Sequence, residues 1–408
     1  MPLLSLIFLL NPIAGIASWI WVALRNIDRT SWTALRGLAL LLSLYLGFVN
    51  TTKELYGDFL AYNEYYRDAL NSSLLQYLLL YAKEPVYYTF SWVICRLTDA
   101  NWPIYVTFFT TASYMAIYEA VILIAKKTDC SKYHVITVLV FTAFFFQTFA
   151  MNGNMLRQSI SQSFALLFLI QLYYNQKYNW LLAIISLGVH TASIPIIGLG
   201  IIPFIRKPMT PKRLLLLSLS IIILSFAFLS MSGLLSKVMF IGYIFARLED
   251  TSQLTSADSW QVEVGLNAQS FILCTLLLVM IAYIYYRYYK SKELDNICHQ
   301  GNMATTNITF VIIMFVLVCN FTEAYYLCMR YQFFIYTFQS VLLLLFLRYV
   351  QFRYIYIIEL LVSVLMFPYF CYYFSNGTFK YANLSDIIIT NPILYFVKIL
   401  KSATTRLI

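Results

Sequence analysis

The segment GDFLAYNEYYRD, residues 57–68, is the first polar, charge-rich stretch of a chain that opens with two apolar runs. Asp58, Tyr62 and Tyr66 stand at positions i, i+4 and i+8, and Tyr65 stands beside them at i+7. On a helix, this spacing places one carboxylate and three phenols on the same face. Phenol rings and a carboxylate on one face suit the binding of a sugar, through ring stacking and hydrogen bonds.

A second charged break, Lys83-Glu84-Pro85, follows this segment and precedes another apolar run. An acid at the mouth of a membrane helix needs a polar partner or water. Residues 57–85 are therefore interpreted as part of a sugar-binding, charge-handling site on the outer face of a membrane protein.

The composition of the whole chain predicts the membrane. Hydrophobic residues make up 61% of the sequence and charged residues 11%, and several apolar runs approach the ~20 residues that a helix needs to cross a bilayer. These runs do not alternate as the strands of a membrane barrel do. We therefore expect an all-α polytopic membrane protein with about 10–12 transmembrane helices, forming a single integral membrane domain over residues 1–408.

Charge and cysteine usage exclude several other classes. The net charge of +10 fits basic cytoplasmic loops better than a nucleic-acid surface. The seven cysteines and three histidines lack the paired spacing of a disulfide framework or a zinc site. We therefore expect no metal, no cofactor and no nucleic-acid partner.

Loop charges assign the two sides of the membrane. Loops 51–75 and 232–266 are net acidic and are predicted to be periplasmic, because basic residues favour the cytoplasm. Lysines follow the span after 76–97, and four basic residues follow 180–205. The run 76–97 is therefore predicted to dip and return or to lie at the membrane interface, and for 180–205 a hairpin that turns near His190 is favoured over a single crossing. The first apolar run, Leu3–Leu24, lacks signal-peptide features and is expected to be a retained span, with Asn11-Pro12 as a candidate break.

With this topology, six ionisable residues lie at or near the outer side: Asp58, Glu84, Arg157, His190, Arg247 and Arg330. An ionisable group at membrane depth is costly, which makes each a functional candidate. Each also has a simpler structural explanation, such as a loop acid, a helix-terminal charge, a snorkelling arginine or a core histidine.

The chemistry open to this set is limited. No Asp-x-Asp pair, Ser-His-Asp signal or phosphate-cradling glycine loop accompanies it. Arginines can bind a lipid-linked diphosphate by bidentate contacts and stabilise it as a leaving group without a metal. A carboxylate or His190 can take a proton from an acceptor hydroxyl.

Three segments resemble one family. The pattern Asp58…Tyr62…Tyr66, followed by Glu84-Pro85, resembles the start of the EpsG/Wzy-like polysaccharide polymerases. Their Asn-x-x-Arg-Gln segment and their His-x-x-Ser turn have counterparts in Asn154-Met155-Leu156-Arg157-Gln158-Ser159 and in Gly188-Val189-His190-Thr191-Ala192-Ser193. Met329-Arg330-Tyr331 with Tyr336 is similar to their late Arg-rich span. The resemblance covers about residues 50–200 and leaves 376–408 without a signature.

The resemblance implies a multi-pass bacterial inner-membrane glycosyltransferase with its active site facing the periplasm. Such enzymes polymerise undecaprenyl-diphosphate-linked repeat units into the O-antigen of lipopolysaccharide or into capsular polysaccharide and exopolysaccharide. The implied partners are undecaprenyl-diphosphate-linked glycans, membrane lipids, and a chain-length regulator and flippase of the same pathway.

Candidate roles follow from the residues and the resemblance together. The catalytic candidates are Asp58, Glu84, Arg157 and His190. The substrate-binding candidates are Tyr62, Tyr66, Asn154, Gln158, Arg247 and Arg330. Two alternatives stay open: a flippase or transporter for lipid-linked glycans, and a membrane acyltransferase that modifies a glycan with His134 or His299.

Overall fold

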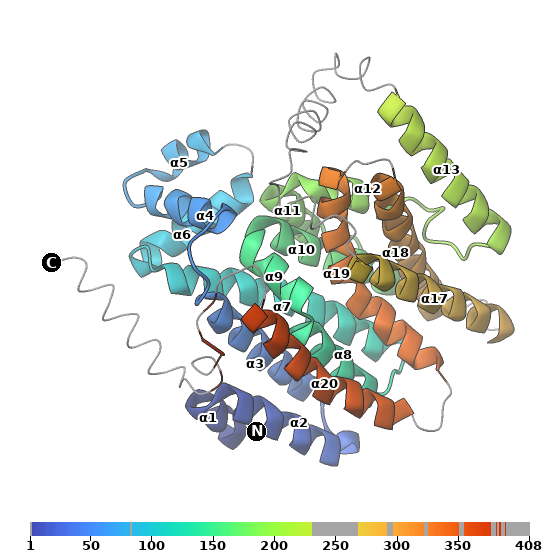
Figure 1. The fold of residues 1–408 in the computed structure, drawn as a ribbon, viewed down its shortest axis with the longest axis horizontal. Coiled ribbons are helices and arrows are strands. Elements are labelled where there is room, and N and C mark those ends of the chain that lie inside the picture. The colour runs from blue at the N-terminus through green and yellow to red at the C-terminus, as the bar shows by residue number, and fades with distance from the viewer. Residues whose placement is uncertain are drawn as a thin grey trace. The chain divides into compact units, whose positions relative to one another are not determined.

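The structure is a computed structural model that describes residues 2–81, 84–230, 268–291, 297–321, 325–350 and 355–376, together with Tyr381, Asn383, Leu384 and Ile388. The regular elements in these residues are all helices (Figure 1). Six of them are long and apolar enough to cross a membrane, and a bent pair makes a seventh if it counts as one span. The expected class, an all-α polytopic membrane protein, is confirmed.

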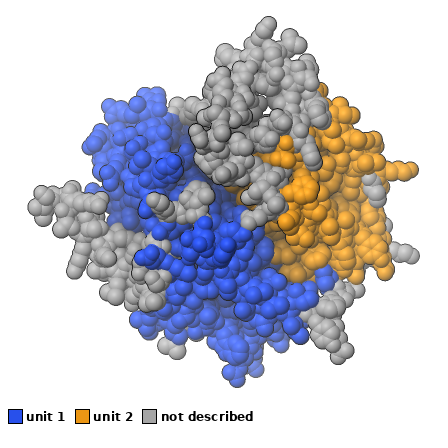
Figure 2. All heavy atoms as spheres, in the orientation of Figure 1, with its two compact units in different colours: residues 1–194, 350–408 blue, residues 195–349 orange. Residues whose placement is uncertain are grey.

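The chain divides into two compact units (Figure 2). Unit 1 comprises residues 1–194 and 350–408, and unit 2 comprises residues 195–349. The helices of unit 1 are α1 Pro2–Leu10, α2 Pro12–Arg25, α3 Trp32–Asn50, α4 Asp58–Asp68, α5 Leu74–Leu80, α6 Pro85–Thr98, α7 Trp102–Lys127, α8 Lys132–Phe144, α9 Phe146–Asn154, α10 Leu156–Asn175, α11 Trp180–Val189 and α20 Ile355–Asn376, with 3-10 turns η1 Ile27–Arg29 and η2 Thr191–Ser193. Unit 2 contains α12 Ile194–Ile201, which begins one residue before the boundary, α13 Pro211–Ser230, α17 Ala268–Ser291, α18 Ile297–Phe321 and α19 Tyr325–Tyr349.

Helix α7 forms the centre of unit 1, where it packs against α3 and α10. The Ser113 hydroxyl of α7 lies 2.9 Å from that of Ser159 and 2.8 Å from that of Ser163, both on α10. On the other side, a Cβ at Gly47 of α3 would lie only 3.0 Å from Thr107. Small residues at these positions let the helix backbones approach closely, as in other membrane helix pairs.

The first apolar run is broken where the sequence predicted. Asn11 caps α2 by accepting the Ala14 N–H at 2.9 Å, and Pro12 occupies the first helical position. Gly15 lies against α1, since a Cβ there would come within 2.3 Å of the Phe8 Cα. The break leaves helices of 9 and 14 residues, and neither alone has the ~20 residues of a crossing helix.

The other two predicted breaks are also present. Between Leu80 and Pro85 the chain leaves α5 and starts α6, helices of 7 and 14 residues. Between Val189 and Ile194 it turns through η2, which separates α11 from α12. All four helices are shorter than a bilayer requires. Whether the two runs dip and return stays a prediction, as does the periplasmic side of loop 51–75, which contains α4.

The apolar runs 134–151 and 307–322 each predict one membrane span from the sequence, and the structure differs from that expectation at both. In the first run, α8 and α9 meet at a bend of 50°, because Phe145 adopts an extended backbone between them. The helix that contains the second run, α18, begins ten residues earlier, at Ile297. Its first turns include polar residues such as Asn302, which do not look like part of a span in the sequence but are buried inside unit 2. Loop 232–266 and most of 376–408 lie outside the described residues.

Candidate active site

Three of the predicted residues lie at helix ends of unit 1. Glu84 precedes Pro85 at the start of α6, where proline takes the first helical position because it has no N–H to satisfy. Arg157 is the second residue of α10. His190 directly follows α11, and its Nδ1 accepts the Ala192 N–H at 3.0 Å, which caps the turn η2. Helix ends bring these groups from distant segments to one place.

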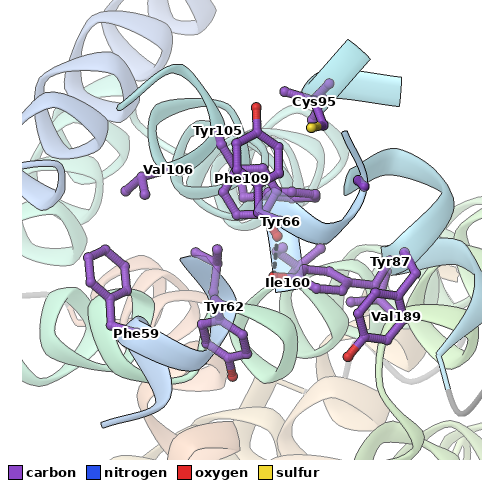
Figure 3. Packing of buried hydrophobic residues seen from close by; sticks show 14 of the residues in the cluster. Phe59, Tyr62, Tyr66, Tyr87, Cys95, Tyr105, Val106, Phe109, Ile160 and Val189 are labelled. Carbon is purple, nitrogen blue, oxygen red and sulfur yellow. Dashed lines mark hydrogen bonds between the residues drawn. The ribbon is translucent and has the colours of Figure 1, made fainter. Parts of the chain in front are cut away.

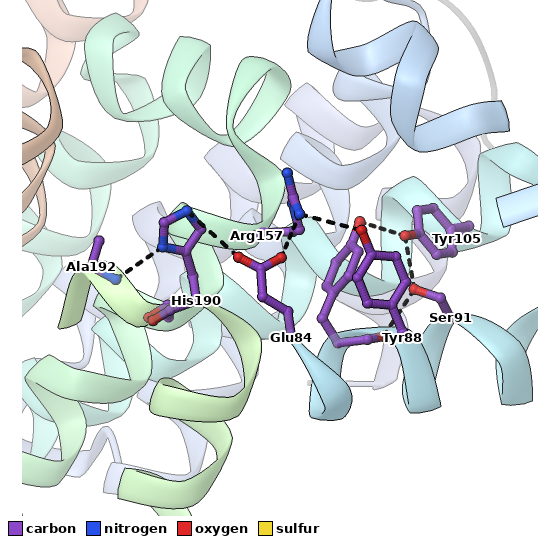
Figure 4. Close-up of polar contacts among 9 residues, drawn as sticks. Glu84, Tyr88, Ser91, Tyr105, Arg157, His190 and Ala192 are labelled. Carbon is purple, nitrogen blue, oxygen red and sulfur yellow. Dashed lines mark hydrogen bonds and ion pairs between the residues drawn. The ribbon is translucent and has the colours of Figure 1, made fainter. Parts of the chain in front are cut away.

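The Glu84 carboxylate lies between Arg157 and His190 and contacts both (Figure 4). The Arg157 guanidinium donates from Nη1 to Glu84 Oε2 and, at 3.3 Å, to the Tyr88 hydroxyl. His190 Nε2 lies 3.7 Å from Glu84 Oε1. The Glu84 side chain is only 8% exposed and the Arg157 side chain 26% exposed. The carboxylate is therefore held between a guanidinium and an imidazole, and the guanidinium is the more accessible partner.

The hydrogen bond to Ala192 determines the tautomer of His190. Because Nδ1 accepts a backbone N–H, the hydrogen of the neutral ring is on Nε2, which faces Glu84. In this arrangement Nδ1 accepts the Ala192 N–H and Nε2 carries the hydrogen, so Nε2 faces the carboxylate as a donor. Glu84 is thus the proton acceptor of the pair, and His190 is its neighbouring donor.

Aromatic rings surround the guanidinium. Arg157 lies 5.1 Å from the Tyr62 ring centroid and 5.9 Å from that of Tyr87. Tyr62 and Tyr87 belong to a buried aromatic cluster on α4, α6 and α7 (Figure 3). Rings at this distance attract a cation, and a site that excludes water strengthens the charge interactions inside it. The predicted phenol face of residues 57–68 therefore reaches the arginine through Tyr62.

Tyr66 points elsewhere. Its hydroxyl lies 2.9 Å from Thr98 Oγ1, and its ring packs against Trp102 and Tyr105. The side chain is fully buried in the aromatic cluster. The contacts of Tyr66 are those of a core residue, and a substrate-binding role for it stays a prediction.

Lys53 is a buried cation that the sequence analysis did not single out. Its side chain follows α3 and is only 6% exposed. The amine donates to the Gly153 carbonyl at 2.8 Å and to the side-chain oxygen of Asn154, and it lies 4.9 Å from the Phe59 ring centroid. The sequence signal for its burial was its position just beyond a long apolar span. Its charge alone, as one of several in the loop 51–75, does not reveal this burial.

The Asp58 carboxylate influences Lys53 and Tyr62 through its charge. It is the first residue of α4 and is exposed to solvent. Burial lowers the pKa of Lys53 to about 7, and the Asp58 carboxylate opposes that shift. Burial also raises the pKa of Tyr62, while the charge of Arg157 lowers it. Asp58 is thus an electrostatic neighbour of the site rather than a contact of Glu84 or His190.

The remaining candidates are distributed more widely. Asn154 belongs to the site through Lys53, and Gln158 is buried beside Arg157 on α10. Arg330 lies on α19 in unit 2, and Arg247 lies outside the described residues. Their substrate-binding roles stay predictions.

The other two histidines have separate surroundings. His134 Nδ1 contacts the Glu359 carboxylate of α20 in unit 1, and its ring stacks on Tyr356. His299 lies in unit 2 with its Nδ1 3.5 Å from the Tyr349 hydroxyl. Within the described ranges, no group of three or more His, Cys, Asp and Glu residues is arranged to hold a metal ion.

The buried pair of Glu84 and Arg157 should contribute more to stability than an exposed ion pair does. Glu84→Gln leaves the largely buried Arg157 guanidinium without a counterion, which should lower the free energy of unfolding by about 2 kcal/mol or more. The exposed pair of Arg36 and Glu119, with two N–O contacts of 2.8 and 2.9 Å, supplies a matched control. Glu119→Gln should cost at most about 1 kcal/mol. Thermal unfolding of the purified proteins in detergent measures both; equal losses would contradict the buried pair.

The fold and this site define a class: a multi-pass helical membrane protein with a charged, aromatic-lined site at the ends of short helices. The model of the EpsG family matches residues 35–403, which is most of the chain, and the protein belongs to that family. No curated protein and no solved structure matches the sequence. The family membership places the protein in polysaccharide biosynthesis and agrees with the segments that resembled it.

Proposed function

We propose that this protein polymerises undecaprenyl-diphosphate-linked repeat units into O-antigen or into capsular polysaccharide or exopolysaccharide, at the periplasmic face of the inner membrane. Membership of the EpsG family supports a polymerase-like function. The cluster of Glu84, Arg157 and His190 supports a glycosyl transfer, since it offers an anion-binding guanidinium and a proton-accepting carboxylate with a histidine beside it. Their roles as catalytic residues are part of this proposal.

The incomplete hydrogen bonding of the Arg157 guanidinium is the main support for this proposal. Its Nη1 contacts Glu84 and Tyr88, but its Nε is buried without a hydrogen-bond acceptor. A buried charged donor that lacks an acceptor is costly and is typical of a functional position. Phosphate oxygens are suitable acceptors, because a guanidinium presents its N–H groups as a planar fork that matches them. Arg157 is therefore the group that would bind the diphosphate.

Binding of the diphosphate would also prepare the proton acceptor. A diphosphate on Arg157 competes with Glu84 for the same guanidinium, and the released carboxylate is freer to accept a proton. Glu84 also lies beside His190 Nε2, whose hydrogen faces the carboxylate and would help to orient it. Substrate binding would thus activate Glu84 as the proton acceptor.

The proposed glycosyl transfer needs only the donor, the acceptor and these side chains. The oxygen of an acceptor sugar hydroxyl bonds to the anomeric carbon of the donor glycan, and the bond from that carbon to the diphosphate oxygen breaks. The hydroxyl proton passes to the Glu84 carboxylate. The bonding electrons leave with the diphosphate, whose growing charge Arg157 stabilises.

Deleting the gene in frame tests this function. We expect the ladder of surface glycan on a gel to collapse to a single repeat unit on its acceptor, since synthesis and export of the unit continue without polymerisation. A plasmid copy of the wild-type gene should restore the ladder. Loss of even the single unit would favour the flippase, and an intact ladder would favour a modifying enzyme such as the acyltransferase.

A further inference from the structure

Lys53 binds the end of a helix that leads directly into the candidate site. Helix α9 ends with Gly153 and Asn154, and the last carbonyls of a helix have no partner inside the helix. The Lys53 amine donates to the Gly153 carbonyl at 2.8 Å and to the Asn154 side chain. A cation at this end of a helix is also favoured by the helix dipole. Lys53 is therefore a C-terminal cap of α9 supplied by the turn that follows α3.

The capped end determines where Arg157 begins. Only Met155 separates α9 from α10, and Arg157 is the second residue of α10. The Asn154 amide also donates to the Ala150 carbonyl at 2.8 Å, so the last turn of α9 is bonded on two sides. A shift of this junction would move the guanidinium relative to Glu84, which belongs to a different segment.

Close packing at Gly153 leaves the junction little freedom. A Cβ at this position would lie 2.7 Å from Asn50 Oδ1, 2.9 Å from the Tyr381 hydroxyl and 3.5 Å from Lys53 Cδ. Glycine is needed here because the side chains of Asn50 and Tyr381 approach the α9 backbone directly. The hydrogen bond from the Lys53 amine to the Gly153 carbonyl therefore forms at a place where the end of α9 is already closely packed.

We infer that Lys53 is a positioning residue for the proposed reaction: its charged amine caps α9 and thereby keeps Arg157 directed at Glu84 and the substrate. This inference rests on the proposed function for its catalytic consequence, but the capping itself does not. Lys53 does not need to touch the substrate for this role.

The charge of Lys53 connects this role to pH. The groups that face its amine include the charged Asp58 and the Phe59 ring from α4, and Gly153 and Asn154 from α9. With a pKa of about 7, the amine is protonated below that pH and loses its charge above it. A neutral amine is a weaker donor to carbonyl oxygens. The cap should therefore weaken as the pH rises.

Hydrogen–deuterium exchange of the full-length protein tests the cap without reference to activity. Lys53→Met should increase deuterium uptake in residues 150–158 by about threefold or more at early times, because the end of α9 opens more often. Lys132 supplies the matched control, since its amine donates at 3.3 Å to the Ile27 and Asp28 carbonyls away from the site. Lys132→Met should leave uptake in residues 150–158 unchanged.

The pH profile of polymerisation tests the charge requirement. In membranes supplied with lipid-linked repeat units, wild-type activity should fall above pH 7, while Lys53→Arg should stay active at least about one pH unit higher, because a guanidinium keeps its charge. Lys53→Met should lose about tenfold to a hundredfold below pH 7, the scale expected when a catalytic group is displaced, and the difference from the wild type should narrow above pH 7, where the wild-type amine loses its charge.

The outcomes separate the two proposals. Unchanged uptake in Lys53→Met would overturn the cap, and an unchanged alkaline fall in Lys53→Arg would overturn the requirement for charge at Lys53. If wild-type membranes polymerise nothing, the proposed function fails, while the exchange result still decides whether Lys53 caps α9.

Discussion

Cells that carry Arg157→Ala should make no polymer, although the protein stays in the membrane. The variant removes the guanidinium that contacts Glu84 and Tyr88 and lies over the Tyr62 ring. Loss of a charge that stabilises a leaving diphosphate should reduce chain growth by about a hundredfold or more. A gel of surface glycan, with the membrane protein quantified on a blot, measures both quantities.

Two further variants make this result specific. Arg157→Lys should not restore the ladder, because an ammonium is a compact charge that lacks the planar fork of a guanidinium. Arg36→Ala should leave the ladder intact, since Arg36 forms an exposed pair with Glu119 in the same unit. Normal ladders from Arg157→Ala would refute the assignment of Arg157 to the diphosphate.

Sequence reasoning located the breaks between helices, because local chemistry determines them. Asn11-Pro12, Glu84-Pro85 and the turn at His190 each combine a capping side chain or a proline with a change in apolar pattern. The structure ends or starts a helix at all three. The same breaks carry Glu84 and His190, so the site was partly visible as a set of helix ends.

Contacts between distant segments were not available from the sequence. Glu84 and Arg157 are 73 positions apart, and Lys53 and Gly153 are 100 apart. Lys53 entered the prediction only as one charge of the loop 51–75, although the fold buries it against the end of α9. Periodicity alone also could not distinguish Tyr62, which reaches Arg157, from Tyr66, which bonds to Thr98. Which residue on a helical face reaches a site depends on tertiary packing.

Gly188→Ala, which adds one methyl group outside the candidate site, should reduce activity by displacing Glu84. Gly188 lies on α11, two positions before His190, and packs against the start of α6. A Cβ there would come within 2.2 Å of Val86 Cγ2 and 2.9 Å of Val86 Cβ. A valine side chain has few alternative rotamers in a helix, so the backbone of α6 must move. Glu84 precedes Val86 by two residues and would move with it, away from Arg157 and His190.

We therefore expect Gly188→Ala to lower the free energy of unfolding by about 1–3 kcal/mol through overpacking and to reduce chain growth by about tenfold or more. Adding Val86→Ala removes the nearest clashing atom and should restore part of both. Gly198→Ala is the matched control, because a Cβ at that position of α12 meets no atom within 4 Å. Melting in detergent and glycan ladders give the two readouts. If Gly188→Ala behaves like Gly198→Ala, the close contact of α11 with α6 does not position Glu84, and the carboxylate must be held by its ion pair alone.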